Sequence, residues 1–291
     1  MTTKRDSTTW PTGAALVHDI RTAVVDEGTA AFWHLGQASW IVKYSHATIA
    51  FDLFLMPSSG QLQRRFEPPV SPADLDFLDA AFCSHDHLDH LDPFAVEGIA
   101  KASRHTTFVV PECAASQAIT LVGDASRVVV GDVDAIIDVA GLSVRTVPAA
   151  HGTERDPIAE CVWERDPNVG WRFVGFVVDI GGVRIYHAGD SEVYPGMVDR
   201  LAPLHIDVAL LPINGRDWFR ERHGIIGNMD EREAAYLAHA IGARVLVPMH
   251  YDMFAGNPGS PGRLVDLCAT QFPGQAVVIP GRCTRWTYRP E

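Results

Sequence analysis

The stretch CSHDHLDHLD places three histidines and three aspartates within ten residues. His85 and His87 are two residues apart, so on extended backbone their side chains share one face. Asp89 and His90 follow, where a turn can direct them toward a second position nearby. Imidazole suits zinc and other transition metals, and carboxylate also suits harder ions such as manganese. The spacing H-x-H-x-D-H therefore predicts half of a two-metal site, with Asp86 on the opposite face orienting one of the histidines.

A two-metal centre needs further ligands, and three later apolar runs end in a suitable residue. His151 closes VRTVPAAH, Asp190 closes RIYHAGD, and His250 closes VLVPMH. Each of these residues is expected at the rim of a sheet, because each follows a run that reads as a buried strand. A solvated polar turn would account for the first motif alone. It does not account for all four features together, which predict a dinuclear centre.

A mixture of strands and helices must position these residues. We expect strands within residues 30–44, 47–55, 80–87, 106–111, 127–131, 135–151, 173–191, 208–214, 243–254 and 276–280. We expect helices within residues 14–20, 93–99, 112–122, 195–204, 229–241 and 264–271, and one starting at Ser71. Asn228 and Glu231 have capping-box spacing, Gly181-Gly182 predicts a hairpin turn, and residues 152–170 read as an irregular loop. No linker divides the chain, so we expect one domain over residues 1–291, with 1–27 as a peripheral extension.

The order of the motifs resembles the metallo-β-lactamase superfamily over residues 31–253, from Asp52 in IAFDLF through HxHxDH to the last histidine. The resemblance implies an α/β fold, a four-layer αβ/βα sandwich with two central mixed β-sheets flanked by helices and the metals at one edge. It implies one ion held by His85, His87 and His151, a second held by Asp89, His90 and His250, and Asp190 bridging both. It also implies that Asp52 supports the site as a hydrogen-bond acceptor, and His187 is a further candidate for a supporting role.

Longer stretches narrow the resemblance. HLGQASWIVKY, YHAGDSEVY, LLPINGRDW, GNMDEREAA and VPMHYDMF are similar to the L-ascorbate-6-phosphate lactonase branch, which is described as manganese-dependent and cytosolic. We therefore expect two divalent ions, manganese or zinc, with iron as a further candidate. Two such ions lower the pKa of a bridging water, and the resulting hydroxide is expected to open a lactone of a sugar phosphate. Asp89, Asp190 and Tyr251 are the expected catalytic residues, with Asp89 moving the proton and Tyr251 hydrogen-bonding the substrate carbonyl.

Four further residues near the same predicted edge are candidates for substrate binding: Asn214, Arg216, Tyr194 and His223. Arg216 could bind a phosphate bidentately, or it could instead pair with Asp217 or another nearby acid. Tyr194 could serve only in packing, and His223 could simply be solvated. The alternatives for the whole protein are a metal-dependent phosphodiesterase, another ester or thioester hydrolase of the same fold, and a non-catalytic metal-binding protein.

The amino-acid composition limits which kinds of partner and which cellular location we expect. The formal net charge of -12 argues against a broad nucleic-acid interface, so we expect a small-molecule substrate, anionic if it is a sugar phosphate. No run of 18 apolar residues predicts a membrane span. The five cysteines are dispersed without a CxxC pair, which is typical of reduced thiols and predicts a cytoplasmic location. Association into a homo-oligomer is left open.

Overall fold

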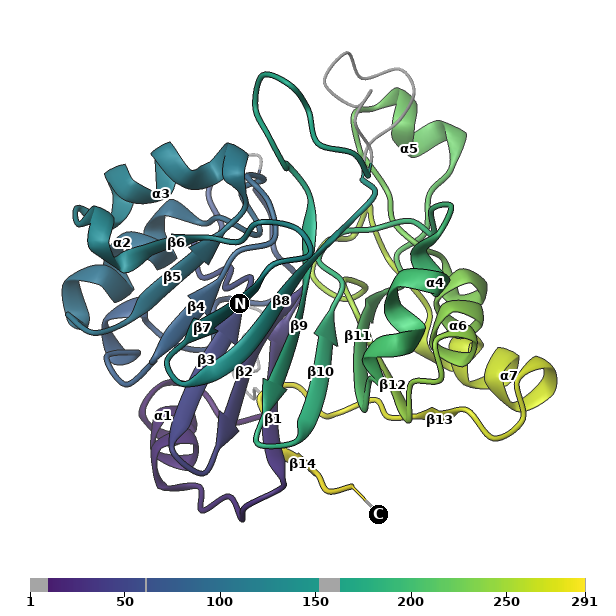
Figure 1. Cartoon of the computed structure of the whole chain (residues 1–291), viewed down its shortest axis with the longest axis horizontal. Helices are drawn as coiled ribbons and strands as arrows, with labels where there is room; N and C mark the ends of the chain where they lie inside the picture. Colours follow the sequence, from purple (N-terminus) through teal and green to yellow (C-terminus); the bar gives the residue numbers. More distant parts are fainter. Residues whose placement is uncertain (1–9, 61, 152–162, 291) are drawn as a thin grey trace, which may run out of the picture.

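The computed structural model describes residues 10–60, 62–151 and 163–290. Two seven-stranded sheets form its centre, with strand orders β14-β1-β2-β3-β4-β5-β6 and β13-β12-β11-β10-β9-β8-β7. Helices α1, α2 and α3 lie outside the first sheet, and α4, α6 and α7 lie outside the second (Figure 1). This arrangement confirms the predicted four-layer sandwich with two mixed sheets.

The strands have the following bounds: β1 Ala30–Gly36, β2 Ser39–Tyr44, β3 Ala47–Phe51, β4 Ala80–Phe82, β5 Thr107–Val110, β6 Val128–Val130, β7 Ile136–Val139, β8 Leu142–Pro148, β9 Val174–Ile180, β10 Val183–His187, β11 Val208–Pro212, β12 Val245–Met249, β13 Ala276–Val277 and β14 Trp286–Tyr288. The α-helices are α1 Gly13–Thr22, α2 Pro93–Ala102, α3 Ala115–Val122, α4 Met197–Leu201, α5 Trp218–Arg222, α6 Glu231–Ala240 and α7 Pro261–Gln271. Short 3-10 helices span Pro72–Asp74, Glu112–Ala114, Ala125–Arg127 and Ala202–Leu204.

Parallel pairing brings strand ends to one edge. In the first sheet β3, β4, β5 and β6 are parallel neighbours, and in the second β10, β11, β12 and β13 are. Parallel strands present their carboxyl ends at the same side of the sheet. The segments after β4, β10 and β12, which hold most of the candidate ligands, therefore meet at one edge of the sandwich.

The core has two parts, as expected of sheets that are covered on both faces. Between the sheets lie large buried side chains such as Phe32, Trp40 and Phe176. Beneath the first sheet's helices lies a second cluster that includes Leu16 and Ile20 of α1, both with 0% exposure. Helix α1 therefore contributes two side chains to this cluster, and the division of the chain into one domain with residues 1–27 as an extension stays a prediction.

Several boundaries differ from the sequence prediction for local reasons. The helix expected from Ser71 is only a 3-10 turn, and Ser71 caps it by accepting from the Ala73 amide. The capping box of α6 is formed by Asp230 and Glu233 instead of Asn228 and Glu231. The sequence analysis missed α5 and β14, both of which are short. Residues 152–162 of the predicted long loop lie outside the described residues.

Candidate metal centre

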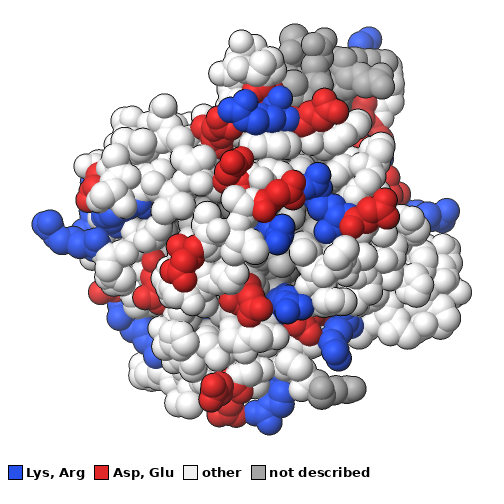
Figure 2. Space-filling model, viewed as in Figure 1, with Lys and Arg blue, Asp and Glu red and all other residues white. Residues whose placement is uncertain are grey.

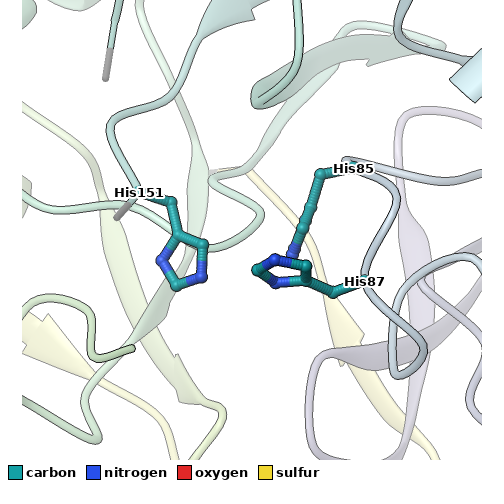
Figure 3. A group of neighbouring side chains, drawn as sticks. All are labelled: His85, His87 and His151. Atoms are coloured by element: carbon teal, nitrogen blue, oxygen red, sulfur yellow. The ribbon is translucent and has the colours of Figure 1, made fainter. Parts of the chain in front are cut away.

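Three histidines form the first group of candidate ligands. One ligand-capable atom from each of His85, His87 and His151 lies within 4.8 Å of the others. Figure 3 shows the three rings converging from two separate segments, one after β4 and one after β8. Their arrangement matches the set expected to hold one ion.

The second group consists of Asp89, His90 and His250, again with ligand atoms within 4.8 Å of one another. Asp190 lies between the two groups. Its Oδ1 is 3.3 Å from His250 Nε2 and 3.4 Å from His90 Nε2, and its Oδ2 is 3.7 Å from His151 Nε2. One carboxylate thus faces members of both groups, which is the position expected of a bridging ligand.

Asp52 organises the centre from behind. Its carboxylate accepts from His90 Nδ1 at 2.7 Å and from the amide and the hydroxyl of Ser84, each at 2.7 Å. Asp52 has a φ of 43°, a left-handed conformation that is uncommon for a residue other than glycine and is typical of functional sites. Its expected supporting role agrees with these contacts. Ser84 was missed by the sequence analysis, because a serine beside a histidine motif carries no distinct signal.

His187 lies one layer further from the ligands. Its ring stacks on Phe51 at 4.9 Å between centroids, and its Nε2 lies 3.0 Å from the Ala38 carbonyl oxygen. Its Nδ1 lies 3.9 Å from Asp52 Oδ2. His187 therefore packs behind Asp52 and contacts the centre through that residue.

The donor set fits a divalent cation. Four buried atoms, His85 Nε2, His90 Nε2, His151 Nδ1 and Asp190 Oδ1, have no hydrogen-bond partner among the described residues. Buried polar atoms are normally satisfied, so this concentration of unpartnered atoms is unusual for a structural cluster. Imidazole nitrogens and carboxylate oxygens in this number are ligands for transition metals and manganese.

The electrostatics of the cluster are consistent with metal binding. Burial lowers the pKa of His85 well below its usual value and that of His151 to about 4, so both imidazoles are neutral and keep a lone pair for an ion. Burial alone would also lower the pKa of His250, but the Asp190 and Asp89 carboxylates raise it to about 9. A proton on this histidine compensates the aspartates in the same way as a bound cation would.

Comparison with known proteins settles the family. A model described as "Beta-lactamase superfamily domain" matches residues 51–251. The chain belongs to the beta-lactamase superfamily. A UPF0173 metal-dependent hydrolase of Methanoculleus marisnigri is 31% identical over 223 residues, which are 76% of this chain and 80% of that protein. The protein of the same name from Alkaliphilus metalliredigens is 35% identical over 119 residues, which are 41% of this chain and 46% of that protein.

A solved structure agrees with the fold. The metallo hydrolase of Ignicoccus hospitalis covers 90% of this chain and 100% of its own, with a TM-score of 0.66 and 20% identity. By its similarity to the UPF0173 protein of Methanoculleus marisnigri, this superfamily member is a metal-dependent hydrolase, with the histidines and aspartates above as its candidate metal-binding groups. The two curated relatives are named UPF0173 metal-dependent hydrolases, and the similarity to the L-ascorbate-6-phosphate lactonase branch stays a prediction. Among the described residues no helix is both long and apolar enough to cross a membrane.

Two predicted site residues of this superfamily member have other partners. Asp86 was expected to orient a histidine, but its carboxylate accepts from Arg172 Nε at 3.1 Å. Arg216 was expected to bind a phosphate or to pair with an acid, and the second alternative is the one observed. Its guanidinium donates bidentately to Glu233 at 2.6 and 2.7 Å and lies 3.2 Å from Glu192. Its partners are thus two glutamates and not Asp217.

The remaining substrate-binding candidates also contact other protein groups. The Asn214 amide donates to Asn257, the Tyr194 hydroxyl donates to the Pro148 carbonyl at 3.0 Å, and the exposed His223 ring packs on Phe219. Tyr251 lies beside His34, with ring centroids 6.0 Å apart. Neither these three candidates nor Tyr251 line the cavity described next. The sequence placed them near the correct edge but could not specify where their side chains point.

A cavity of about 640 Å³ opens onto the candidate ligands. Five of them form part of its wall: His87, Asp89, His151, Asp190 and His250. Much of the remaining wall is apolar, with Phe54, Leu62, Leu88, Ile225, Ile226 and Phe254. Amides of Gln37, Gln63 and Asn257 add polar atoms, and no Lys or Arg is among the described residues of the wall. Gln37 is a site residue that the sequence analysis missed.

Proposed function

We propose that this protein is a two-metal hydrolase that cleaves a carboxylic ester or lactone bearing an apolar substituent. The observation that carries the proposal is the convergence of the two ligand groups at the wall of one largely apolar cavity. Such cavities, with a few convergent polar groups, are typical of small-molecule sites.

The two groups of neighbouring side chains indicate which residues would hold each ion. His85, His87 and His151 would hold one ion, Asp89, His90 and His250 the other, and Asp190 would contact both. Manganese and zinc suit this donor set, and iron is a further candidate. When bound, two divalent ions at such a centre provide Lewis acidity and an activated water near neutral pH.

The protein itself contributes positioning and exclusion of water. Asp52 fixes the ring of His90 so that its Nε2 faces the Asp190 carboxylate. Asp89 lines the cavity, and we assign to it the transfer of a proton from the attacking water to the leaving oxygen. The side chains of Phe54 and Phe254 cover the apolar side of the same cavity, where they would displace water around a bound substrate.

The wall favours a neutral substrate over a sugar phosphate. A phosphate is usually recognised by arginine, lysine or a set of backbone amides. The described wall has no such cation, and the expected candidate Arg216 is held by Glu233 and Glu192. A lactone of a sugar phosphate is therefore the second substrate candidate, and a lactone or ester with an alkyl or aryl group is the first.

Phosphodiester hydrolysis has less support. On the face shown in Figure 2, acidic and basic side chains alternate without a continuous basic area. A nucleic-acid substrate would favour clustered basic side chains. We accordingly expect a small-molecule substrate, and a cytoplasmic location stays a prediction from the dispersed cysteines.

A substrate panel tests the proposal. Chelator-treated protein reloaded with Mn²⁺ or Zn²⁺ would be assayed with alkyl lactones and esters of increasing chain length, a sugar-phosphate lactone, a thioester and a phosphodiester. We expect kcat/KM to rise with alkyl length, by up to about fourfold per methylene that enters the cavity. Turnover of the phosphodiester alone would overturn the proposal, and a preference for the sugar phosphate would overturn its substrate class.

A further inference from the structure

Gln37 stands at a position where its residue type is unexpected. It begins the two-residue loop between β1 and β2, with a φ of 57°. Two-residue hairpin loops with positive φ favour asparagine, aspartate and glycine. The left-handed backbone therefore costs free energy at Gln37, and glutamine lacks the local side-chain hydrogen bond with which asparagine offsets this cost. The surrounding structure must stabilise this conformation instead.

The backbone of Gln37 is fixed by polar contacts on both sides of the peptide. Its amide donates to Asp252 Oδ1 at 2.9 Å, and its carbonyl accepts from the His250 amide at 2.8 Å. His34 Nε2 lies 3.2 Å from the same carbonyl oxygen, and Asp252 is in turn bound by Arg282 at 2.6 Å. These contacts tie the loop directly to a candidate metal ligand.

The side chain of Gln37 reaches two atoms of the second ligand group. Its Nε2 donates to Asp89 Oδ2 at 2.8 Å and lies 2.8 Å from His250 Nε2. Gln37 is 2% exposed as a residue, and it is part of the cavity wall. The amide nitrogen of Gln37 therefore donates to one group that is expected to bind an ion and contacts the ring nitrogen of another.

We propose that Gln37 is a positioning residue for the ion site formed by Asp89, His90 and His250. Before an ion binds, its amide holds the Asp89 carboxylate through a hydrogen bond and limits the position of the His250 ring through a direct contact. A carboxylate oxygen has two lone pairs, so Asp89 can keep this hydrogen bond while it ligates an ion. With an ion bound, the lone pair of His250 would go to the ion, and the second N–H of Gln37 would be available to a molecule in the cavity. This inference rests on the metal site of the proposed function.

Two substitutions separate this role from a structural one. Gln37→Asn and Gln37→Gly both suit the left-handed backbone, so we expect the apparent Tm of the metal-free protein to stay the same or rise. Neither side chain can make both contacts of the glutamine amide. Residues that orient metal ligands typically change metal affinity by about 10- to 100-fold, so we expect one of two Mn²⁺ equivalents to bind that much more weakly.

The experiment is calorimetric titration of Mn²⁺ into the full-length, chelator-treated protein and its variants. The matched control is Ala140→Asn, because Ala140 has a φ of 55° in the exposed hairpin loop between β7 and β8. It should bind Mn²⁺ as the wild type does. Equal Mn²⁺ affinities of Gln37→Asn and the wild type would overturn this inference alone. Failure of the wild type to bind Mn²⁺ would overturn the metal site as well, and bound Mn²⁺ without any hydrolysis would overturn only the proposed reaction.

Discussion

His90 donates from Nδ1 to the Asp52 carboxylate at 2.7 Å, and both side chains are almost completely buried. This hydrogen bond fixes which ring nitrogen faces the candidate metal centre, because the other nitrogen, Nε2, lies 3.4 Å from Asp190. Asp52 in turn is held by Ser84. The aspartate after β3 therefore orients a ligand that follows β4.

Substitution Asp52→Asn tests this relationship. The amide removes the negative charge that accepts from His90, so we expect metal affinity to fall by about 10- to 100-fold. Competition with a fluorescent chelator would measure the affinity. Asp86→Asn is the matched control, since Asp86 pairs with Arg172 and should leave affinity close to that of the wild type. Equal losses in the two variants would contradict the assigned role of Asp52.

Loss of a ligand should change the stoichiometry as well as the rate. His87→Ala removes one member of the three-histidine group, so we expect the bound Mn²⁺ to fall from two equivalents toward one. Asp190→Ala affects both groups, and we expect it to abolish metal uptake and turnover together. Metal analysis of the dialysed proteins would measure this. Retention of two equivalents in Asp190→Ala would show that the carboxylate does not bridge.

Removal of metal should destabilise the protein. An ion present at 100 times its dissociation constant stabilises the folded state by about 2.7 kcal/mol. At about 2 °C per kcal/mol for a domain of this size, chelation should lower Tm by about 5 °C. Differential scanning calorimetry with and without added Mn²⁺ would measure the shift. An unchanged Tm would indicate that no ion binds the folded protein.

The apolar wall can be tested through substrate length. Phe254→Ala enlarges the cavity beside the candidate metal centre and removes apolar contact. We expect kcat/KM for a hexyl or longer ester to fall by about 10-fold, equivalent to roughly 1.4 kcal/mol, and that for an acetyl ester to stay within about twofold. Equal losses for both esters would show that Phe254 supports the fold or the metals instead of the substrate.

Arg216 offers a test of the correction to its expected role. Because its guanidinium is engaged by Glu233 and Glu192, Arg216→Ala should lower stability by about 1 kcal/mol, a value limited by its partial exposure. KM for a sugar-phosphate lactone should not change. A rise in that KM of about 10-fold or more would restore Arg216 as a phosphate ligand.

The ligand set could be predicted from sequence because it follows from strand ends. His151, Asp190 and His250 each follow an apolar run, and parallel strands bring such positions to one edge. The contact between Gln37 and Asp89 could not be predicted in this way, since it depends on a hairpin loop and a turn 52 residues apart. Pairing of β14 with β1 likewise has no local signal, as only three residues take part.

Side-chain direction was the other part that sequence could not specify. Arg216, Tyr194 and Asn214 lie near the predicted edge, yet each makes its hydrogen bonds with other protein groups. The distinction depends on acceptors such as Glu233, whose proximity arises only when α6 packs on the sheet. A position at the end of a strand therefore predicts which edge of the sheet a residue lies near, but it does not predict which groups its side chain contacts.

The two sheets contribute different ligands to the centre. His85, His87, Asp89 and His90 follow a strand of the first sheet, whereas His151, Asp190 and His250 follow strands of the second. A bound ion would therefore cross-link the two sheets of the sandwich. A shift of one sheet relative to the other would separate the ligands and release the ion. The metal content of the protein should therefore report whether its two sheets are correctly aligned.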